Sequence, residues 1–206
     1  MLEFSPLCLK RLKKDNNLKL ILDNSDSIHL DIIDWDFAKN EGFSVTEINE
    51  FVSDKPKHVH IMSWDPLKHI KELTNVDSIS FHCDVADCQN IIRAIKDKDI
   101  KVGLVVSPST PIEEVFKYVP EIDRVVIMAV QPGFSAQEYL PATSQKIVSI
   151  RNIFPSLEIV VDGGMNNKTI REVKLLGANS FVVCSVIAKS KNVVEKISEL
   201  KSSYSE

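Results

Sequence analysis

The 206-residue sequence lacks any apolar run of about 18 residues, the length that a membrane-spanning helix requires. Residues 1–15 also lack the apolar run and small-residue cleavage site of a secretory signal. Four cysteines are present without any CxxC spacing: Cys8, Cys83, Cys88 and Cys184. The spacing of these four cysteines therefore indicates neither a structural zinc site nor a redox motif. These absences predict a cytoplasmic protein with free thiols and no membrane partner.

A basic excess is absent as well, because 29 acidic residues outnumber 25 basic ones and the formal net charge is −4. Nucleic-acid-binding proteins usually carry a basic face, so we predict no nucleic-acid partner. What the chain does have is 44% hydrophobic residues, enough for a sizeable core. With no linker in the sequence, we predict one domain spanning residues 1–206.

Short apolar runs alternate with longer amphipathic segments along the whole chain. The runs predict strands at residues 27–33, 58–62, 78–81, 102–106, 124–130, 158–161 and 180–184, with an eighth candidate at 2–5. Several of them are almost continuously apolar and rich in β-branched residues. Such strands are typical of parallel sheets that are buried on both faces.

Helices are predicted between these strands, at residues 88–97, 167–176 and 192–203 and in a segment beginning near Pro111. Asn166 or Asn167 is a suitable N-cap for the second of them, and Gly177 a suitable C-cap. Eight β-α units in about 200 residues predict a single (β/α)8 TIM barrel. The rival fold is an open doubly wound sheet, but its G-x-G-x-x-G motif after the first strand is absent.

Polar residues occur where several predicted strands end. His29 and Asp31 share one face of a strand, His60 lies on the next strand, and Asp162 precedes two glycines. Barrel enzymes carry their functional groups at these strand ends, so the four side chains are expected to converge. Two imidazoles and two carboxylates suit a divalent ion such as zinc, iron, manganese or cobalt. Taken singly, each has a plainer interpretation, as a hydrogen-bonded structural histidine or a helix-capping aspartate.

Five blocks carry a resemblance to a known family: HLDIIDWDFAKN at 29–40, HVHIM at 58–62, SFH at 80–82, IMAVQPGFSAQ at 127–137 and VDGGMN at 161–166. In this order and spacing they resemble the ribulose-phosphate 3-epimerase family, over residues 4–187. The resemblance implies a (β/α)8 barrel of the pentose phosphate pathway that interconverts D-ribulose 5-phosphate and D-xylulose 5-phosphate. It also implies that the protein forms a homo-oligomer and that it binds a small sugar phosphate.

Carried over position by position, the resemblance implies one divalent metal ion bound by His29, Asp31, His60 and Asp162. Asp31 and Asp162 would also be the two acid/base groups, transferring the C3 proton on opposite faces through an enediolate that the metal stabilises. Met62 and Met128 would be apolar cover for the metal. The substrate-binding residues that it implies are His60, Gly133, Phe134, Ser135, Ala136, Gly163, Gly164, Cys184 and Ser185, of which 133–136 would form a lid.

Several positions depart from the family pattern, chiefly in segments that would hold the substrate. The family's serine after the N-terminal proline is matched by Leu7, and glycines of the lid and of the eighth strand are replaced. The changed positions are Leu7, Ile33-Asp34-Trp35, Ala38-Lys39-Asn40, Ser107, Ser135-Ala136 and Cys184-Ser185. Glycines matter here where a positive φ or a close approach to phosphate is needed.

These departures leave three hypotheses for the activity. The first is the epimerase of ribulose 5-phosphate, or of another ketose phosphate such as allulose 6-phosphate. The second is a non-catalytic barrel that binds a sugar phosphate. The third is a barrel related to hexulose-phosphate synthases or decarboxylases, but the lysine of their Asp-x-Lys-x-x-Asp motif is missing from the corresponding strand.

Overall fold

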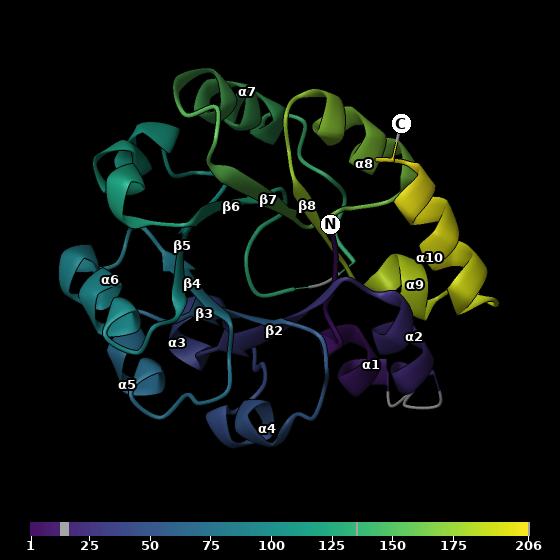
Figure 1. Ribbon diagram of the computed structural model, residues 1–206, viewed down its shortest axis with the longest axis horizontal. Coiled ribbons are helices and arrows are strands. Elements are labelled where there is room, and N and C mark those ends of the chain that lie inside the picture. Colours follow the sequence, from purple (N-terminus) through teal and green to yellow (C-terminus); the bar gives the residue numbers. More distant parts are fainter. Residues whose placement is uncertain (13–16, 135, 206) are drawn as a thin grey trace.

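Eight parallel strands close into a barrel in sequence order, surrounded by a ring of helices (Figure 1). The computed structural model describes residues 1–12, 17–134 and 136–205, and only the backbone of residues 11 and 12. The strands are β1 (Leu2–Phe4), β2 (Ser27–Ile33), β3 (Lys57–Met62), β4 (Ser78–His82), β5 (Lys101–Val106), β6 (Arg124–Met128), β7 (Glu158–Asp162) and β8 (Ser180–Val183). The predicted (β/α)8 fold is therefore confirmed.

The predicted bounds of β2 are confirmed, and the other strands differ from prediction by one or two residues at an end. The largest difference is in β6, which ends at Met128 and not at Val130. The chain bends there because the Ala129 N–H donates to the Asp162 carbonyl at 2.7 Å, while the Leu140 N–H donates to the Ala129 carbonyl at 2.8 Å. The bend brings Val130 into the lining of the cavity at the barrel mouth.

The helices lie outside the barrel and bury their apolar faces against the strands (Figure 1). They are α1 (Leu7–Leu12), α2 (Leu18–Asn24), α3 (Trp35–Ala38), α4 (Val45–Glu50), α5 (Pro66–Ile70), α6 (Cys88–Lys96), α7 (Thr143–Ile153), α8 (Asn167–Leu175), α9 (Ser185–Ala188) and α10 (Val193–Ser202). The last helix, α10, contacts α2 and so closes the outer ring. Among the described residues, no helix is long and apolar enough to span a bilayer.

The helix predicted to begin near Pro111 is present as a 3-10 helix, η1 (Ile112–Glu121), rather than as an α-helix. Pro120 lies inside it and has no N–H to donate. Its ring would also collide with the carbonyl four residues earlier in an α-helix. Packing holds the segment nonetheless, since the rings of Phe116 and Phe154 lie 5.4 Å apart.

The turn between β7 and α8 is fixed by the predicted cap. The Asn166 side chain accepts from the N–H groups of Lys168 and Thr169, and the Thr169 hydroxyl accepts from the Asn166 N–H. At the other end Gly177 follows the helix with φ of 109°, a conformation that glycine adopts without strain. This rigid start of α8 holds the segment that follows Asp162 in place.

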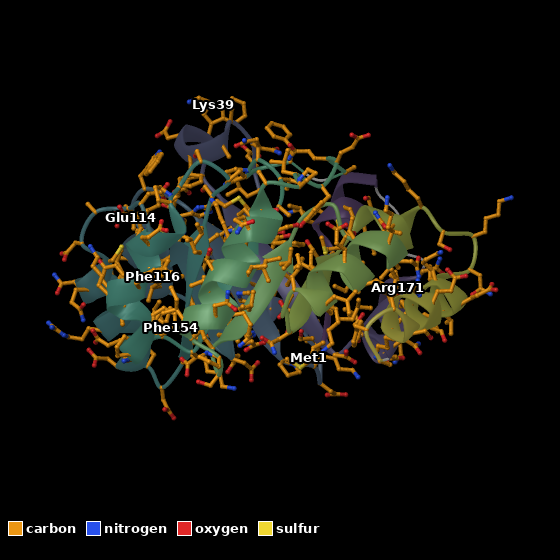
Figure 2. The ribbon with its side chains drawn as sticks, turned by 90° about the horizontal axis from the view of Figure 1, so that it is seen from above. Met1, Lys39, Glu114, Phe116, Phe154 and Arg171 are labelled. Carbon is orange, nitrogen blue, oxygen red and sulfur yellow. The ribbon has the colours of Figure 1, made fainter. Side chains whose placement is uncertain are left out.

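The barrel interior has a polar side and an apolar side. Strands β5 to β8, together with Val130 after β6, contribute a small apolar cluster: Val105, Val126, Met128, Val130, Val160 and Val182. Strands β1 to β4 contribute buried polar side chains instead: Glu3, His29, Asp31, His58, His60, Ser80 and His82. Lys39, after β2, and Met1, before β1, lie at opposite ends of the molecule in Figure 2, so the strand ends open on the Lys39 side.

Candidate active site

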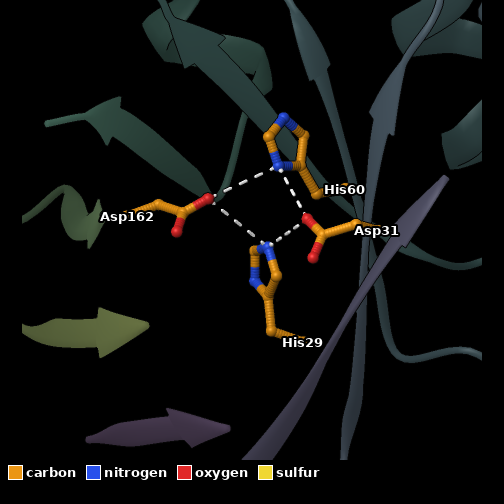
Figure 3. A group of neighbouring side chains, drawn as sticks. All are labelled: His29, Asp31, His60 and Asp162. Carbon is orange, nitrogen blue, oxygen red and sulfur yellow. Dashed lines mark hydrogen bonds and ion pairs between the residues drawn. The ribbon is translucent and has the colours of Figure 1, made fainter. Parts of the chain in front are cut away.

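Four side chains converge at the mouth of the barrel, as the sequence predicted (Figure 3). His29 Nε2 lies 3.2 Å from Asp31 Oδ1 and 3.6 Å from Asp162 Oδ2. His60 Nδ1 lies 3.4 Å and 3.6 Å from the same two oxygens. The two carboxylates approach from opposite sides, and one donor atom from each residue lies within 4.8 Å of the others.

The donor set fits a divalent ion. His60 Nδ1 is buried and has no hydrogen-bond partner among the described residues. A buried polar atom without a partner is rare, and one aimed at two carboxylates is explained by a ligand between them. Nitrogen and oxygen donors in this combination suit zinc, iron, manganese or cobalt.

His60 is oriented from behind by a second histidine. His60 Nε2 and His82 Nε2 lie 3.0 Å apart, and His82 Nδ1 lies 3.0 Å from the Ser107 hydroxyl. Burial, and then the neighbouring His60, lowers the pKa of His82 well below its usual value. A neutral His82 accepts the Nε2 proton of His60, which leaves the Nδ1 lone pair of His60 directed at Asp31 and Asp162.

The Asp31 carboxylate is kept ionised by its surroundings. Burial alone would raise its pKa, but His29 and His60 outweigh burial and the pKa is lowered. The Ser5 hydroxyl adds a hydrogen bond of 2.9 Å to Oδ2, so Oδ1 remains directed at the two histidines. Leu7 was matched to the family's N-terminal serine, but Ser5 is the serine that lies at the end of β1 beside Asp31.

A second buried group, missed by the sequence analysis, lies one layer deeper. Glu3 Oε2 lies 3.4 Å from His29 Nδ1 and 2.8 Å from His58 Nδ1. Its other oxygen lies 3.4 Å from Arg124 Nη1. Burial raises the pKa of Glu3, but His58, His29 and Arg124 together bring it well below the usual value. The available sequence clue was a glutamate inside an apolar strand.

A cavity of about 230 Å³ lies above the four candidate ligands. Its lining includes these predicted substrate-binding or covering residues: Met62, Met128, Gly133, Phe134, Ala136, Gly163, Gly164, Cys184 and Ser185. Ser135 falls outside the described residues, and His60 lies below the cavity. Four polar lining residues were not among the predicted site residues: Ser5, Gln137, Asn166 and Lys189. Their segments were recognised, but strand ends alone do not show which loop side chains turn inward.

The segment around Gly133 and Ala136 has a backbone held by side chains. Asn40 Nδ2 donates to the Gly133 carbonyl at 2.5 Å, and Gln137 Nε2 donates to the carbonyls of Gln131 and Phe134. Gly133 has φ of 99° and Ala136 φ of 64°. Ala136 therefore holds a left-handed conformation at a position where the resemblance expects glycine.

We expect Ala136→Gly to leave stability unchanged or to raise it by up to about 1 kcal/mol, because glycine carries no steric penalty at positive φ. Ala94→Gly is the control, since Ala94 lies in the interior of α6 and has no positive φ. There glycine should lower stability by about 0.5–1 kcal/mol. Urea unfolding of the two variants checks this, and an equal loss in both would contradict the assigned strain.

The fold and the site together define a single-domain TIM barrel with a His/Asp cluster suited to a divalent ion. The profile of the Ribulose-phosphate 3 epimerase family matches residues 1–188, and the chain belongs to this family. The cytoplasmic isoform of ribulose-phosphate 3-epimerase from Oryza sativa subsp. japonica is 32% identical over 188 residues, covering 87% of this chain and 82% of that protein. Ribulose-phosphate 3-epimerase from Bacillus subtilis is 30% identical, covering 87% of each chain.

Solved structures confirm the fold at lower identity. The 3-hexulose-6-phosphate synthase from Salmonella typhimurium has a TM-score of 0.73 and 16% identity, covering 98% of this chain and 97% of that chain. KGPDC from Streptococcus mutans has a TM-score of 0.74 and 13% identity, with coverage of 98% and 96%. At such identities the likeness extends to the barrel alone.

Proposed function

We propose that the chain is a metal-dependent 3-epimerase of a ketose phosphate, acting on D-ribulose 5-phosphate and D-xylulose 5-phosphate. The observation that carries this proposal is the pair of carboxylates, Asp31 and Asp162, facing each other across two buried imidazoles at the floor of a cavity. Inverting a carbon by proton transfer needs an acid/base group on each side of that carbon. Membership of the epimerase family supports the same reaction.

The chemistry begins with a weakly acidic proton on C3, next to the ketone of the sugar. A divalent ion held by His29, Asp31, His60 and Asp162 would supply the positive charge that stabilises the charge developing on the ketone oxygen. One of the two carboxylates removes the C3 proton from its own side. The other carboxyl group, which starts protonated, returns a proton to the opposite side, so the two groups exchange protonation states in each turnover.

Neighbouring side chains prepare the two carboxylates for this role. The hydrogen bond from Ser5 fixes one oxygen of Asp31 and leaves the other facing the site. Met62, Met128 and Val130 line the cavity with apolar groups. By excluding water, they protect the carbanionic charge from protonation by solvent and strengthen the electrostatic interactions inside.

The phosphate of the substrate would bind in the part of the cavity that is lined by the turns following β7 and β8. Gly163 and Gly164 have φ of 104° and 68°, and an added Cβ on Gly164 would lie 2.6 Å from the Tyr139 backbone. Only glycine fits this close packing, and the turn leads into the N-terminus of α8. Cys184 and Ser185, from the turn after β8, line the same cavity.

Ser5→Ala should lower kcat by about 10-fold without preventing folding, because it removes one charge-assisted hydrogen bond from Asp31. Ser53→Ala, in an irregular segment after α4, is the control and should leave kcat unchanged. Steady-state kinetics of the two variants test this expectation. An unchanged kcat in Ser5→Ala would show that Asp31 needs no help from Ser5.

The substrate is tested by a direct comparison of ribulose 5-phosphate and allulose 6-phosphate with the metal-loaded protein. We expect a higher kcat/KM for ribulose 5-phosphate. A preference for allulose 6-phosphate would indicate that the altered residues Ala136 and Cys184 accommodate a longer substrate. Binding of both sugars without turnover of either would contradict the epimerase and support a non-catalytic sugar-phosphate-binding protein. A cytoplasmic location and a homo-oligomeric state stay predictions.

A further inference from the structure

One buried charge has no part in the proton transfer described above. The Glu3 side chain lies in the barrel interior with 1% of its surface exposed, in a strand of three residues. Burying a carboxylate is costly unless it is paired and hydrogen-bonded. The groups that form hydrogen bonds and ion pairs with Glu3 therefore indicate its role.

Those partners lie on two sides of Glu3. On one side, Oε2 faces the Nδ1 atoms of His29 at 3.4 Å and His58 at 2.8 Å. On the other, Oε1 faces Arg124 Nη1, and Arg124 Nη2 lies 3.1 Å from Glu158 Oε2. Arg124 thus bridges two carboxylates, and only Glu3 continues to a candidate metal ligand.

The contacts of His58 show which way the hydrogen bonds run. A carboxylate oxygen only accepts hydrogen bonds, so the 2.8 Å contact with Glu3 Oε2 makes His58 Nδ1 a donor. His58 Nε2 lies 2.7 Å from the Ser80 hydroxyl and can accept from it. Glu3 is then an acceptor for both Nδ1–H groups.

We propose that Glu3 is the positioning residue of His29: it accepts the Nδ1–H, turns the ring and directs the Nε2 lone pair at the gap between Asp31 and Asp162. The proposal rests on the metal site of the proposed function. A carboxylate behind a histidine ligand fixes its tautomer and raises its basicity. Losing such a partner typically weakens metal binding by about 10–100-fold.

The same three residues, Glu3, His29 and His58, are also close enough together to be considered as a second metal site. Two observations favour the hydrogen-bonded arrangement. The Arg124 guanidinium lies against Glu3 and would repel a cation there. The 2.8 Å separation of Glu3 Oε2 and His58 Nδ1 is a normal hydrogen-bond length, whereas two donors bound to one tetrahedral ion lie about 3.3 Å apart.

The test compares Glu3→Gln with Glu158→Gln, because each removes one carboxylate from Arg124 and only the first removes the partner of His29. Cobalt(II) is the probe, and its affinity is measured by competition with a chelator. We expect one ion per wild-type chain, 10–100-fold weaker binding and an altered visible absorption spectrum in Glu3→Gln, and wild-type affinity in Glu158→Gln. Equal affinities in both variants, equal losses in both, or two ions per wild-type chain would overturn the proposal.

A second measurement needs no variant and covers the case in which Glu3→Gln does not fold. Proton NMR of the cobalt-loaded wild-type protein should show a strongly shifted imidazole N–H signal from His29 that exchanges slowly with solvent. A rapidly exchanging or missing signal would refute the hydrogen bond to Glu3. If the wild-type chain bound no cobalt, the proposed function would fail as well, whereas normal binding with an unprotected N–H would refute only the role of Glu3.

Discussion

Asp31→Asn and Asp162→Asn are each expected to lower the kcat of epimerisation by about 10³-fold or more. General acid–base catalysis contributes about 10²–10⁴-fold, and each aspartate is also a candidate metal ligand. An asparagine has a similar shape but accepts no proton, so the loss reports the chemistry more than the packing. Asp36→Asn is the control, since the Asp36 side chain is 91% exposed on α3, and it should retain full activity.

The two variants should also differ from each other in a way that inactivation alone does not produce. Each retains one carboxylate, on one side of C3, and that carboxylate still exchanges the proton of one epimer. In deuterated water, one variant should label ribulose 5-phosphate and the other xylulose 5-phosphate. Labelling of the same epimer by both variants would contradict the placement of Asp31 and Asp162 on opposite sides of the carbon.

Removal of the metal has the second-largest expected effect. We expect chelator-treated protein to lose at least about 10³-fold in kcat, because a carboxylate alone is too weak a base for a proton next to a ketone. Added zinc, manganese, iron(II) or cobalt(II) should restore the activity, and their relative efficiency identifies the preferred ion. Full activity after complete removal, verified by elemental analysis, would contradict the metal-dependent reaction.

The same treatment should change stability. Binding at 100 times the dissociation constant adds about 2.7 kcal/mol, which corresponds to a rise in Tm of roughly 5–10 °C for a domain of this size. Calorimetry with and without the ion measures it. His60→Gln, which replaces the partnerless Nδ1, should abolish most of the rise, whereas His69→Gln on α5 should preserve it. An undiminished rise in His60→Gln would place the ion elsewhere.

The barrel and the four candidate ligands were predictable from the sequence because both depend on local patterns. Apolar β-branched runs predict buried parallel strands, and a polar residue at the end of such a run lies at the mouth. Asp162 is the last residue of β7, whereas His29, Asp31 and His60 lie inside β2 and β3 and are polar residues in otherwise mostly apolar strands. The cap at Asn166 was predictable for the same reason, since its partners are two and three residues away.

The supporting side chains were not predictable, because their contacts join distant parts of the chain. Glu3 meets His29, His58 and Arg124 at separations of 26, 55 and 121 residues. Whether residues so far apart in the sequence meet in space depends on the stagger of strands around the closed barrel, which no local pattern encodes. The 3-10 form of η1 was not predictable for a different reason: Pro120 lies at the far end of a segment whose beginning is typical of an α-helix.

The proposed reaction removes the proton at C3 of a ketose phosphate on one side and returns a proton on the other. The most direct measurement is NMR of ribulose 5-phosphate incubated with the metal-loaded protein in deuterated water. We expect xylulose 5-phosphate carrying deuterium at C3 and at no other carbon, with no product from the Asp31→Asn/Asp162→Asn double variant. Epimerisation without deuterium at C3, or undiminished exchange in the double variant, would contradict the proposed reaction.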